Sequence, residues 1–295
     1  MIGTLFDRGH LPLLRRAALS AGRATASQRV SLVAAGCAFY ATLALFPTIT
    51  MLISLYGLVY NPDTVQPQLH YLQGFMPPPA FALISDRIDS IVGQPTKGLG
   101  LSFVVSLLIS FWSSTTGTKS ILNALSLAYN ERETRGLVRF QLVAFSMTLI
   151  AIIGAGMAIG FLVFVPIALA HLDLPSGFTF FVGLIGPATM ILFLAGSLGL
   201  VYRFGPAGKG RIFYAPGAAV ATIAWLVTSS AFGFYVGHFA AYSALYGPLA
   251  TLIGLMMWFY LSAYVVLFGA ELNAALDREW RHLRAVQARG EAAVR

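Results

Sequence analysis

The residues best suited to acid–base or metal chemistry are few in this chain and far apart. Its five histidines stand at positions 10, 70, 171, 238 and 282, and no two have a spacing that would bring them to one metal ion. The eleven carboxylates include no D-x-D pair. The sequence also lacks a phosphate-binding P-loop and a G-x-S-x-G nucleophile elbow. We therefore expect a protein that is not an enzyme and that uses no metal or cofactor.

The charged residues point instead to a lipid environment. They make up 10% of the chain, against about 25% in soluble domains, while hydrophobic residues reach 57%. The net charge of +8 could suit nucleic acid, but the basic residues flank apolar runs, where they face lipid headgroups. Membrane lipids, and not nucleic acid, are the expected partners. The single cysteine, Cys37, lies inside an apolar run and cannot form an intrachain disulfide.

The elements that must carry these residues are six long apolar runs. A membrane-spanning helix needs about 20 apolar residues, whereas a spanning strand needs about 9 to 11. The runs therefore predict an all-α integral membrane bundle of six transmembrane helices. The expected spans are residues 30–60, 99–116, 140–170, 178–202, 212–236 and 247–270.

The distribution of basic residues predicts the orientation of these spans. Of the 19 Lys and Arg, all but Arg87 and Lys97 lie before the first run, after the last, or on two alternate connections. Cytoplasmic segments of membrane proteins collect Lys and Arg. Both termini are therefore expected in the cytoplasm. The predicted domains are a cytoplasmic N-terminal segment (1–29), a six-span membrane domain (30–276) and a cytoplasmic C-terminal helix or tail (277–295).

Short amphipathic helices are expected at the two membrane surfaces. In the outer loop, residues 61–98, two apolar stripes at helical spacing predict two helices that cap the bundle. The plainer alternative is a pair of helices that packs on the spans and has no role beyond shielding them. Near the N-terminus, Leu11, Leu14 and Ala18 share one helical face, which predicts a short helix on the inner membrane surface.

Two predictions concern the inner ends of the spans. A break at Gly117 is expected to separate the second span from an interfacial helix with Lys119 on its polar side. The sixth helix is expected to continue into the tail, where Asp277 and Arg281 stand one turn apart and can pair.

Three groups of segments resemble a known family. They read AAGCAFY and LFP (34–40, 45–47), YRFGP and PGA (202–206, 216–218), and YGPLA, WFYLS and GAELN (246–250, 258–262, 269–273). Together they resemble the YihY/BrkB family of bacterial inner-membrane proteins, once labelled ribonuclease BN, over about residues 25–280. Gly205 departs from the family pattern, in which a bulkier residue precedes the proline.

The resemblance implies a multi-pass protein of the bacterial cell inner (cytoplasmic) membrane with six spans. The family has carried ribonuclease and virulence-factor labels, and transport, including transport of lipidic envelope components, has been proposed for it. It supplies no firmly assigned catalytic residues, so none are transferred to this chain.

Several polar residues at the inner ends of the spans are candidates for headgroup binding or gating. Arg203 and Glu271 fall at a similar depth, so an ion pair between them is geometrically allowed. A structural role remains the alternative, with Arg203 reaching to headgroups and Glu271 solvated or held by another basic residue. The hydroxyl cluster 113–118 either lines a polar path or bonds to helix carbonyls and neighbouring helices. The candidates are Arg203, Glu271, Lys119, Tyr202, Asn273 and Arg139.

These features predict a transporter or translocator of an amphiphilic, anionic envelope molecule such as a lipid. A basic inner rim would hold the headgroup, and apolar groove walls would accommodate the acyl chains. The alternative is a non-transporting scaffold of an envelope complex, with envelope proteins or further copies of the chain as partners. Small-solute transport would need a water-accessible site in the middle of the membrane, and the sequence shows none. A ribonuclease would need metal ligands that the sequence does not cluster.

Overall fold

The computed structural model describes residues 11–26, 28–57, 81–82, 85–86, 101–170, 178–208, 212–238 and 248–293 of the 295-residue chain. All regular secondary structure within these ranges is helical, which confirms the predicted all-α class for the described part. The long helices there are α1 (Leu11–Thr25), α2 (Gln28–Gly57), α5 (Leu101–Ala128), α6 (Leu137–Ala170), α7 (Phe178–Phe204), α8 (Ala215–His238) and α10 (Pro248–Ala293).

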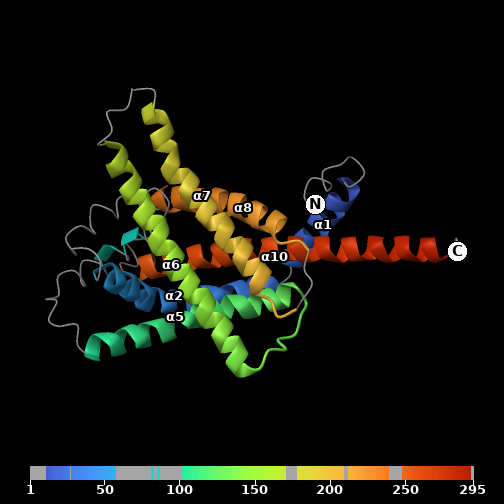
Figure 1. Ribbon diagram of the computed structural model, residues 1–295, viewed down its shortest axis with the longest axis horizontal. Helices are drawn as coiled ribbons and strands as arrows, with labels where there is room; N and C mark the ends of the chain where they lie inside the picture. The colour runs from blue at the N-terminus through green and yellow to red at the C-terminus, as the bar shows by residue number, and fades with distance from the viewer. Residues whose placement is uncertain are drawn as a thin grey trace.

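The described helices are organised around α10. This helix contacts α1, α2, α5 and α8, while α2 also packs along α5, and α6 contacts both α5 and α7. Figure 1 shows α10 running along the longest dimension of the molecule, with its C-terminal end projecting beyond the other helices. Because α10 touches elements from both ends of the chain, it fixes how those elements sit relative to one another.

Small side chains fill the contact region between α2, α5, α8 and α10. Ala34, Ala124, Ala221 and Ala270 are each at most 2% exposed and belong to one buried cluster. Membrane helices gain little from hydrophobic burial against one another, so they associate through close packing of small residues. The composition of this cluster is therefore typical of a membrane bundle.

Four described helices are long and apolar enough to cross a membrane. Their qualifying segments are Leu137–Ala158, Gly186–Phe204, Ala215–Gly237 and Leu249–Ala285. A fifth span is obtained if α1 and α2, which meet at a bend of 67°, are counted as one broken span. The described residues thus show a membrane protein with four or five candidate spans.

Large apolar side chains on the outer surface of these helices support the membrane assignment. Met157 on α6, Leu192 on α7 and Val227 on α8 are 66%, 72% and 64% exposed. Such residues are common on a surface that faces acyl chains, whereas a soluble bundle turns most of them inward.

Helices of the described structure coincide with the predicted span positions, and four of them, or five with the bent α1–α2 pair, are long and apolar enough to cross a membrane. The third to fifth spans, expected at 140–170, 178–202 and 212–236, correspond to α6, α7 and α8, and the first corresponds to α2. The sixth continues without interruption into the tail as α10, as expected. The outer amphipathic helices predicted within 61–98 lie outside the described residues, apart from helical positions at 81–82 and 85–86.

The break expected at Gly117 was wrong, because α5 runs through this position as one helix. Gly117 is buried against α2, and a Cβ there would lie 3.2 Å from the Cβ of Ala44 and 3.6 Å from the carbonyl oxygen of Tyr40. A glycine inside a helix costs about 1 kcal/mol relative to alanine. At this position it allows α5 and α2 to approach closely, and we infer that this contact offsets the cost.

The N-terminal helix forms as predicted, and one of its faces packs against α10. Ala17 and Ala21 are fully buried in a cluster with Phe213 and with residues of α10, whereas Ala18 is exposed. The face of α1 with Ala17 and Ala21 thus packs on α10, while Ala18 stays on the outer face.

Candidate functional site

The polar residues of the predicted site are positioned by a close crossing of α8 and α10. A side chain at Gly217 would collide with Asn273 and with the carbonyl oxygen of Gly269. Asn273, fully buried, closes the crossing with two hydrogen bonds. Its Oδ1 accepts from the Gly217 amide at 2.8 Å, and its Nδ2 donates to the Tyr214 carbonyl at 3.2 Å. These contacts therefore fix the orientation of α10 about its own axis.

Tyr202 of α7 reinforces this arrangement. Its side chain is fully buried, and its hydroxyl donates a hydrogen bond to the Val266 carbonyl at 2.7 Å. A Cβ at Gly269 would lie 2.5 Å from the same hydroxyl oxygen. Tyr202 and Asn273, both predicted as binding or gating residues, thus contact helix backbone in the described structure.

Asp277 fixes the segment that leads into α8. Only 2% of its surface is exposed, and its Oδ1 accepts hydrogen bonds from the amides of Ile212 and Phe213 at 3.1 and 3.2 Å. The predicted pair with Arg281 is present but long, with Nη2 of Arg281 4.0 Å from Oδ2 of Asp277. The backbone contacts are shorter, so we infer that positioning the α7–α8 connection is the main role of Asp277.

Glu271 points away from this crossing, toward α2 and α5. It stands two residues before Asn273, and successive helical residues are rotated by about 100°, so the two side chains leave α10 on nearly opposite sides. Glu271 lines a cavity of about 230 Å³ together with Arg29, Asn130 and Arg278. We call this space the Glu271 cavity.

Glu271 is a mostly buried residue whose carboxylate accepts no hydrogen bond from the described residues. The residue is 7% exposed, and among the described residues no hydrogen-bond donor reaches its carboxylate and no cation lies within 4.0 Å. Arg278 and Arg29 line the same cavity and are close enough for their charges to act on Glu271. A buried carboxylate is costly unless it is paired, so this arrangement suits a ligand.

The left-handed turn that ends α5 supplies the polar wall of the cavity. Asn130 has a φ of 54°, a conformation that asparagine tolerates better than most residues, and the Glu131 amide donates to the Ser126 carbonyl at 2.8 Å. The turn places Asn130 beside Glu271 and ends the helix at the cavity edge.

A second cavity, of about 340 Å³, adjoins the first between α2 and α5. We call it the Lys119 cavity. Its polar lining includes Thr116, Lys119, Ser120 and Asn123, and its walls also include Tyr40. The two cavities share Val33, Ala124 and Leu127 in their linings. Together their linings present basic and polar side chains separated by apolar ones.

The ion pair that the sequence allows between Arg203 and Glu271 is absent from the structure. Arg203 donates to the Tyr214 hydroxyl at 3.3 Å, and its guanidinium lies 5.3 Å from the ring centroids of Phe204 and Tyr214. It therefore lies on the α7–α8 side of α10, whereas Glu271 faces α2 and α5. Arg139, another predicted residue, is exposed at the start of α6 and lines neither cavity.

Lys119 is the predicted candidate, besides Glu271, that lines a cavity. Its Nζ lies 5.4 Å from the ring centroid of Trp112, within the range of a cation–π contact. Arg278 and Asn130 were not predicted as site residues. Arg278 stands seven positions after Glu271, a spacing that returns to the same helix face, so this signal was present in the sequence.

The hydroxyl cluster on α5 makes contacts between helices. The hydroxyls of Thr48 and Ser114 lie 2.6 Å apart and join α2 to α5. Those of Thr118 and Thr148 lie 2.7 Å apart and join α5 to α6. These bonds match the structural alternative given for the cluster, since hydroxyls inside a membrane bundle bond across helices.

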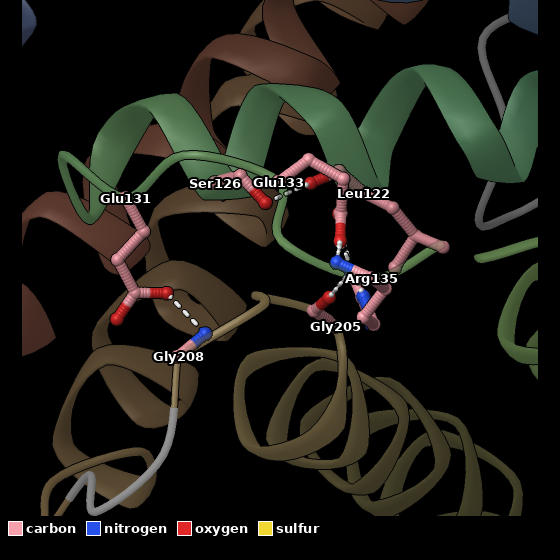
Figure 2. A network of polar contacts seen from close by, with 7 residues as sticks. All are labelled: Leu122, Ser126, Glu131, Glu133, Arg135, Gly205 and Gly208. Carbon is pink, nitrogen blue, oxygen red and sulfur yellow. Dashed lines mark hydrogen bonds and ion pairs between the residues drawn. The ribbon is translucent and has the colours of Figure 1, made fainter. Parts of the chain in front are cut away.

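A separate polar network ties the α5–α6 loop to the α7–α8 loop (Figure 2). Arg135 forms two hydrogen bonds of 2.7 Å with the Glu133 carboxylate and one of 2.9 Å with the Gly205 carbonyl. The Glu131 carboxylate accepts from the Gly208 amide at 2.7 Å. The Arg135 hydrogen bond holds the pKa of Glu133 below its usual value. This network joins the α5–α6 loop to the α7–α8 loop near the end of α5.

Close packing in the same region leaves room only for glycine at position 205. A Cβ at this buried position would lie 3.0 and 3.1 Å from methyl carbons of Leu125 and Leu122, and it would also collide with the Val201 carbonyl oxygen. The bulkier residue expected from the family pattern has no room here.

Within the described residues, no three His, Cys, Asp or Glu side chains gather where they could hold a metal ion. The described part of the chain is thus a multi-span helical membrane protein with an amphipathic cavity pair between α2, α5 and α10.

Comparison with known proteins agrees with this class. The chain belongs to the family described as Virulence factor BrkB, which it matches over residues 21–293. This confirms the family resemblance seen in the sequence. The chain is 29% identical to YfkH of Bacillus subtilis, whose name calls it ribonuclease-like, over 248 residues that cover 82% of this chain and 88% of that protein.

Two further relatives are UPF0761 membrane proteins, matched over a shorter region. The identities are 44% over 72 residues for the protein of Alteromonas mediterranea and 42% over 73 residues for that of Tolumonas auensis. Each match covers 24% of the relative, and 24% and 25% of this chain respectively. No solved structure matches this chain.

Proposed function

We propose that this protein is a translocator of an amphiphilic, anionic envelope molecule such as a lipid in the bacterial inner membrane. The observation that carries the proposal is the pair of adjoining cavities between α2, α5 and α10. Basic side chains of Arg29, Lys119 and Arg278 line them, and so do Val33 and Leu267. A headgroup would bind the cations, while acyl chains would lie along the apolar walls and the outer surface.

The charge balance of the cavities favours a ligand that carries an anionic group. Three cationic side chains (Arg29, Lys119 and Arg278) line them, against the single carboxylate of Glu271. Arginine pairs with phosphate through a fork of hydrogen bonds, and lysine acts as a point charge. The combination suits a phosphate-bearing headgroup.

The proposed topology has six spans with both termini in the cytoplasm. The four spans of α6, α7, α8 and α10 are joined by α2 and α5, helices of 30 and 28 residues that pack on each other. Either is longer than the about 20 residues that a span requires. The bias of Lys and Arg toward both termini and alternate connections supports this orientation.

A vesicle assay tests the proposal. Purified full-length protein is reconstituted into vesicles that contain a fluorescent phospholipid, and the rate at which its headgroup becomes accessible to an external quencher is measured. We expect protein-containing vesicles to exchange the lipid faster than empty ones. Arg29→Ala should lower the rate about tenfold, as the loss of a charge-assisted contact predicts.

Arg132→Ala is the matched control. Arg132 is exposed in the α5–α6 loop and lines neither cavity, so its loss should leave the rate unchanged. Equal rates with and without wild-type protein, or equal losses in the two variants, would contradict the proposal and favour a scaffold.

A further inference from the structure

We propose that the Glu271 cavity recognises a zwitterionic headgroup, one that carries a primary ammonium as well as a phosphate, as in an aminophospholipid. This inference rests on the proposed function and narrows it: the ligand keeps the anionic phosphate that the basic side chains would bind, and a primary ammonium on the same headgroup balances that charge. It assigns to Glu271 the ammonium and to Arg29 and Arg278 the phosphate.

The buried carboxylate is the first observation. Glu271 is more than nine-tenths buried, lines the cavity and has no hydrogen-bond or ion-pair partner among the described residues. A carboxylate in such a place is stabilised when an ammonium group donates hydrogen bonds to it. A headgroup with a phosphate alone would leave Glu271 unpaired and would be repelled by it.

The two arginines provide the second observation. Arg29 and Arg278 line the same cavity as Glu271, yet neither comes within 4.0 Å of its carboxylate oxygens. The guanidinium groups are therefore available to an anion. A ligand with a positive charge alone would be repelled by both arginines. A ligand with both charges matches this lining better than either simple ion.

The dimensions of the two cavities agree with this assignment. The Glu271 cavity, about 230 Å³, has room for a small headgroup, since a water molecule takes about 30 Å³ of liquid volume. The Lys119 cavity adjoins it through Val33 and Leu127. The glycerol backbone and the start of an acyl chain would follow this path along α2.

Lipid binding to the full-length protein in detergent tests the inference. The probes are phosphatidylethanolamine and phosphatidylglycerol with the same fluorescent acyl chain, because they share a phosphate and differ in the ammonium. Wild type should bind phosphatidylethanolamine more tightly. Glu271→Gln should weaken its binding about tenfold, while binding of phosphatidylglycerol should be unchanged or tighter. Arg29→Ala should weaken both.

Glu279→Gln is the matched control, because Glu279 lies on the same helix but lines neither cavity. It should leave both affinities unchanged. The thermal stability of each variant, measured in the same detergent, shows whether it is folded. If Glu271→Gln unfolds, Glu271→Asp, which keeps the charge, should retain the preference for phosphatidylethanolamine, and its loss would overturn the inference.

The outcomes separate this inference from the proposed function. Equal binding of the two lipids by wild type, or a Glu271→Gln variant with unchanged preference, overturns the zwitterionic assignment and leaves lipid translocation intact. Binding of soluble glycerophosphoethanolamine is measured as a third probe. If it binds and neither lipid does, the headgroup chemistry holds but its source is a soluble molecule, and lipid translocation is overturned. Competition between glycerophosphoethanolamine and the lipid supports both proposals.

Discussion

At the scale of single residues, the two polar side chains of the GAELN segment have opposite roles. Asn273 is satisfied on both sides by backbone groups of the segment that opens α8. Glu271, on the other side of α10, is buried without a partner among the described residues. Both are polar residues near the middle of one helix, so composition alone does not distinguish them. The rotation of α10 determines which one faces the cavity.

Removal of the Asn273 amide should destabilise the protein. Asn273→Ala leaves the Gly217 amide and the Tyr214 carbonyl without their partner, and each unsatisfied buried group costs about 1–3 kcal/mol. We expect a lower midpoint of thermal unfolding in detergent. Asn123→Ala, at an exposed position on α5, should leave the midpoint unchanged. Equal midpoints for wild type and Asn273→Ala would show that the crossing does not depend on this side chain.

At the scale of elements, the contact between α8 and α10 depends on the absence of side chains. A Cβ at Gly269 would lie 2.5 Å from the Tyr202 hydroxyl, 2.7 Å from the Gly217 carbonyl oxygen and 2.8 Å from the Ala221 Cβ. The Tyr202 side chain is fully buried and hydrogen-bonded to the Val266 carbonyl, and the other two neighbours are a backbone oxygen and a Cβ, so none of the three can turn aside. The two helices would have to separate to admit a methyl group.

Gly269→Ala should therefore destabilise the bundle by about 1–3 kcal/mol or more, the usual cost of overpacking. Gly196→Ala on α7 provides the comparison, because a Cβ there meets nothing within 4 Å. Alanine is a better helix former than glycine by about 1 kcal/mol, so this variant should be as stable as wild type or more stable. Unfolding of both variants in a graded detergent series provides the measurement, and a Gly269→Ala variant as stable as Gly196→Ala would contradict the packing argument.

Hydropathy and helical spacing predicted most of the described helices, because length and apolar content alone decide whether a segment can cross a bilayer. They did not predict that Gly117 continues a helix, since that depends on Ala44 of a different helix. For the same reason the sequence identified Glu271 and Lys119 but left open whether Arg203 or another basic residue lies near Glu271. Depth along a helix can be counted, whereas the direction of a side chain follows from contacts with elements distant in sequence.

At the scale of the whole molecule, the proposed orientation can be tested in cells. A reporter that is active only in the periplasm should be active when inserted after residue 98 and inactive when fused after residue 295. A cytoplasmic fluorescent reporter should give the reverse pattern. These results follow from the position of Lys and Arg, which cytoplasmic segments retain. An active periplasmic reporter at the C-terminus would contradict the six-span arrangement.

The length of α10 has a mechanical consequence. Its 46 residues extend about 69 Å at 1.5 Å per residue, more than twice the roughly 30 Å of a hydrocarbon layer. No proline or glycine interrupts it between Glu271 and Arg289, so this stretch behaves as a stiff rod (Figure 1). A rotation of the projecting end would be transmitted along this stretch and would turn Glu271 relative to the cavity that it lines.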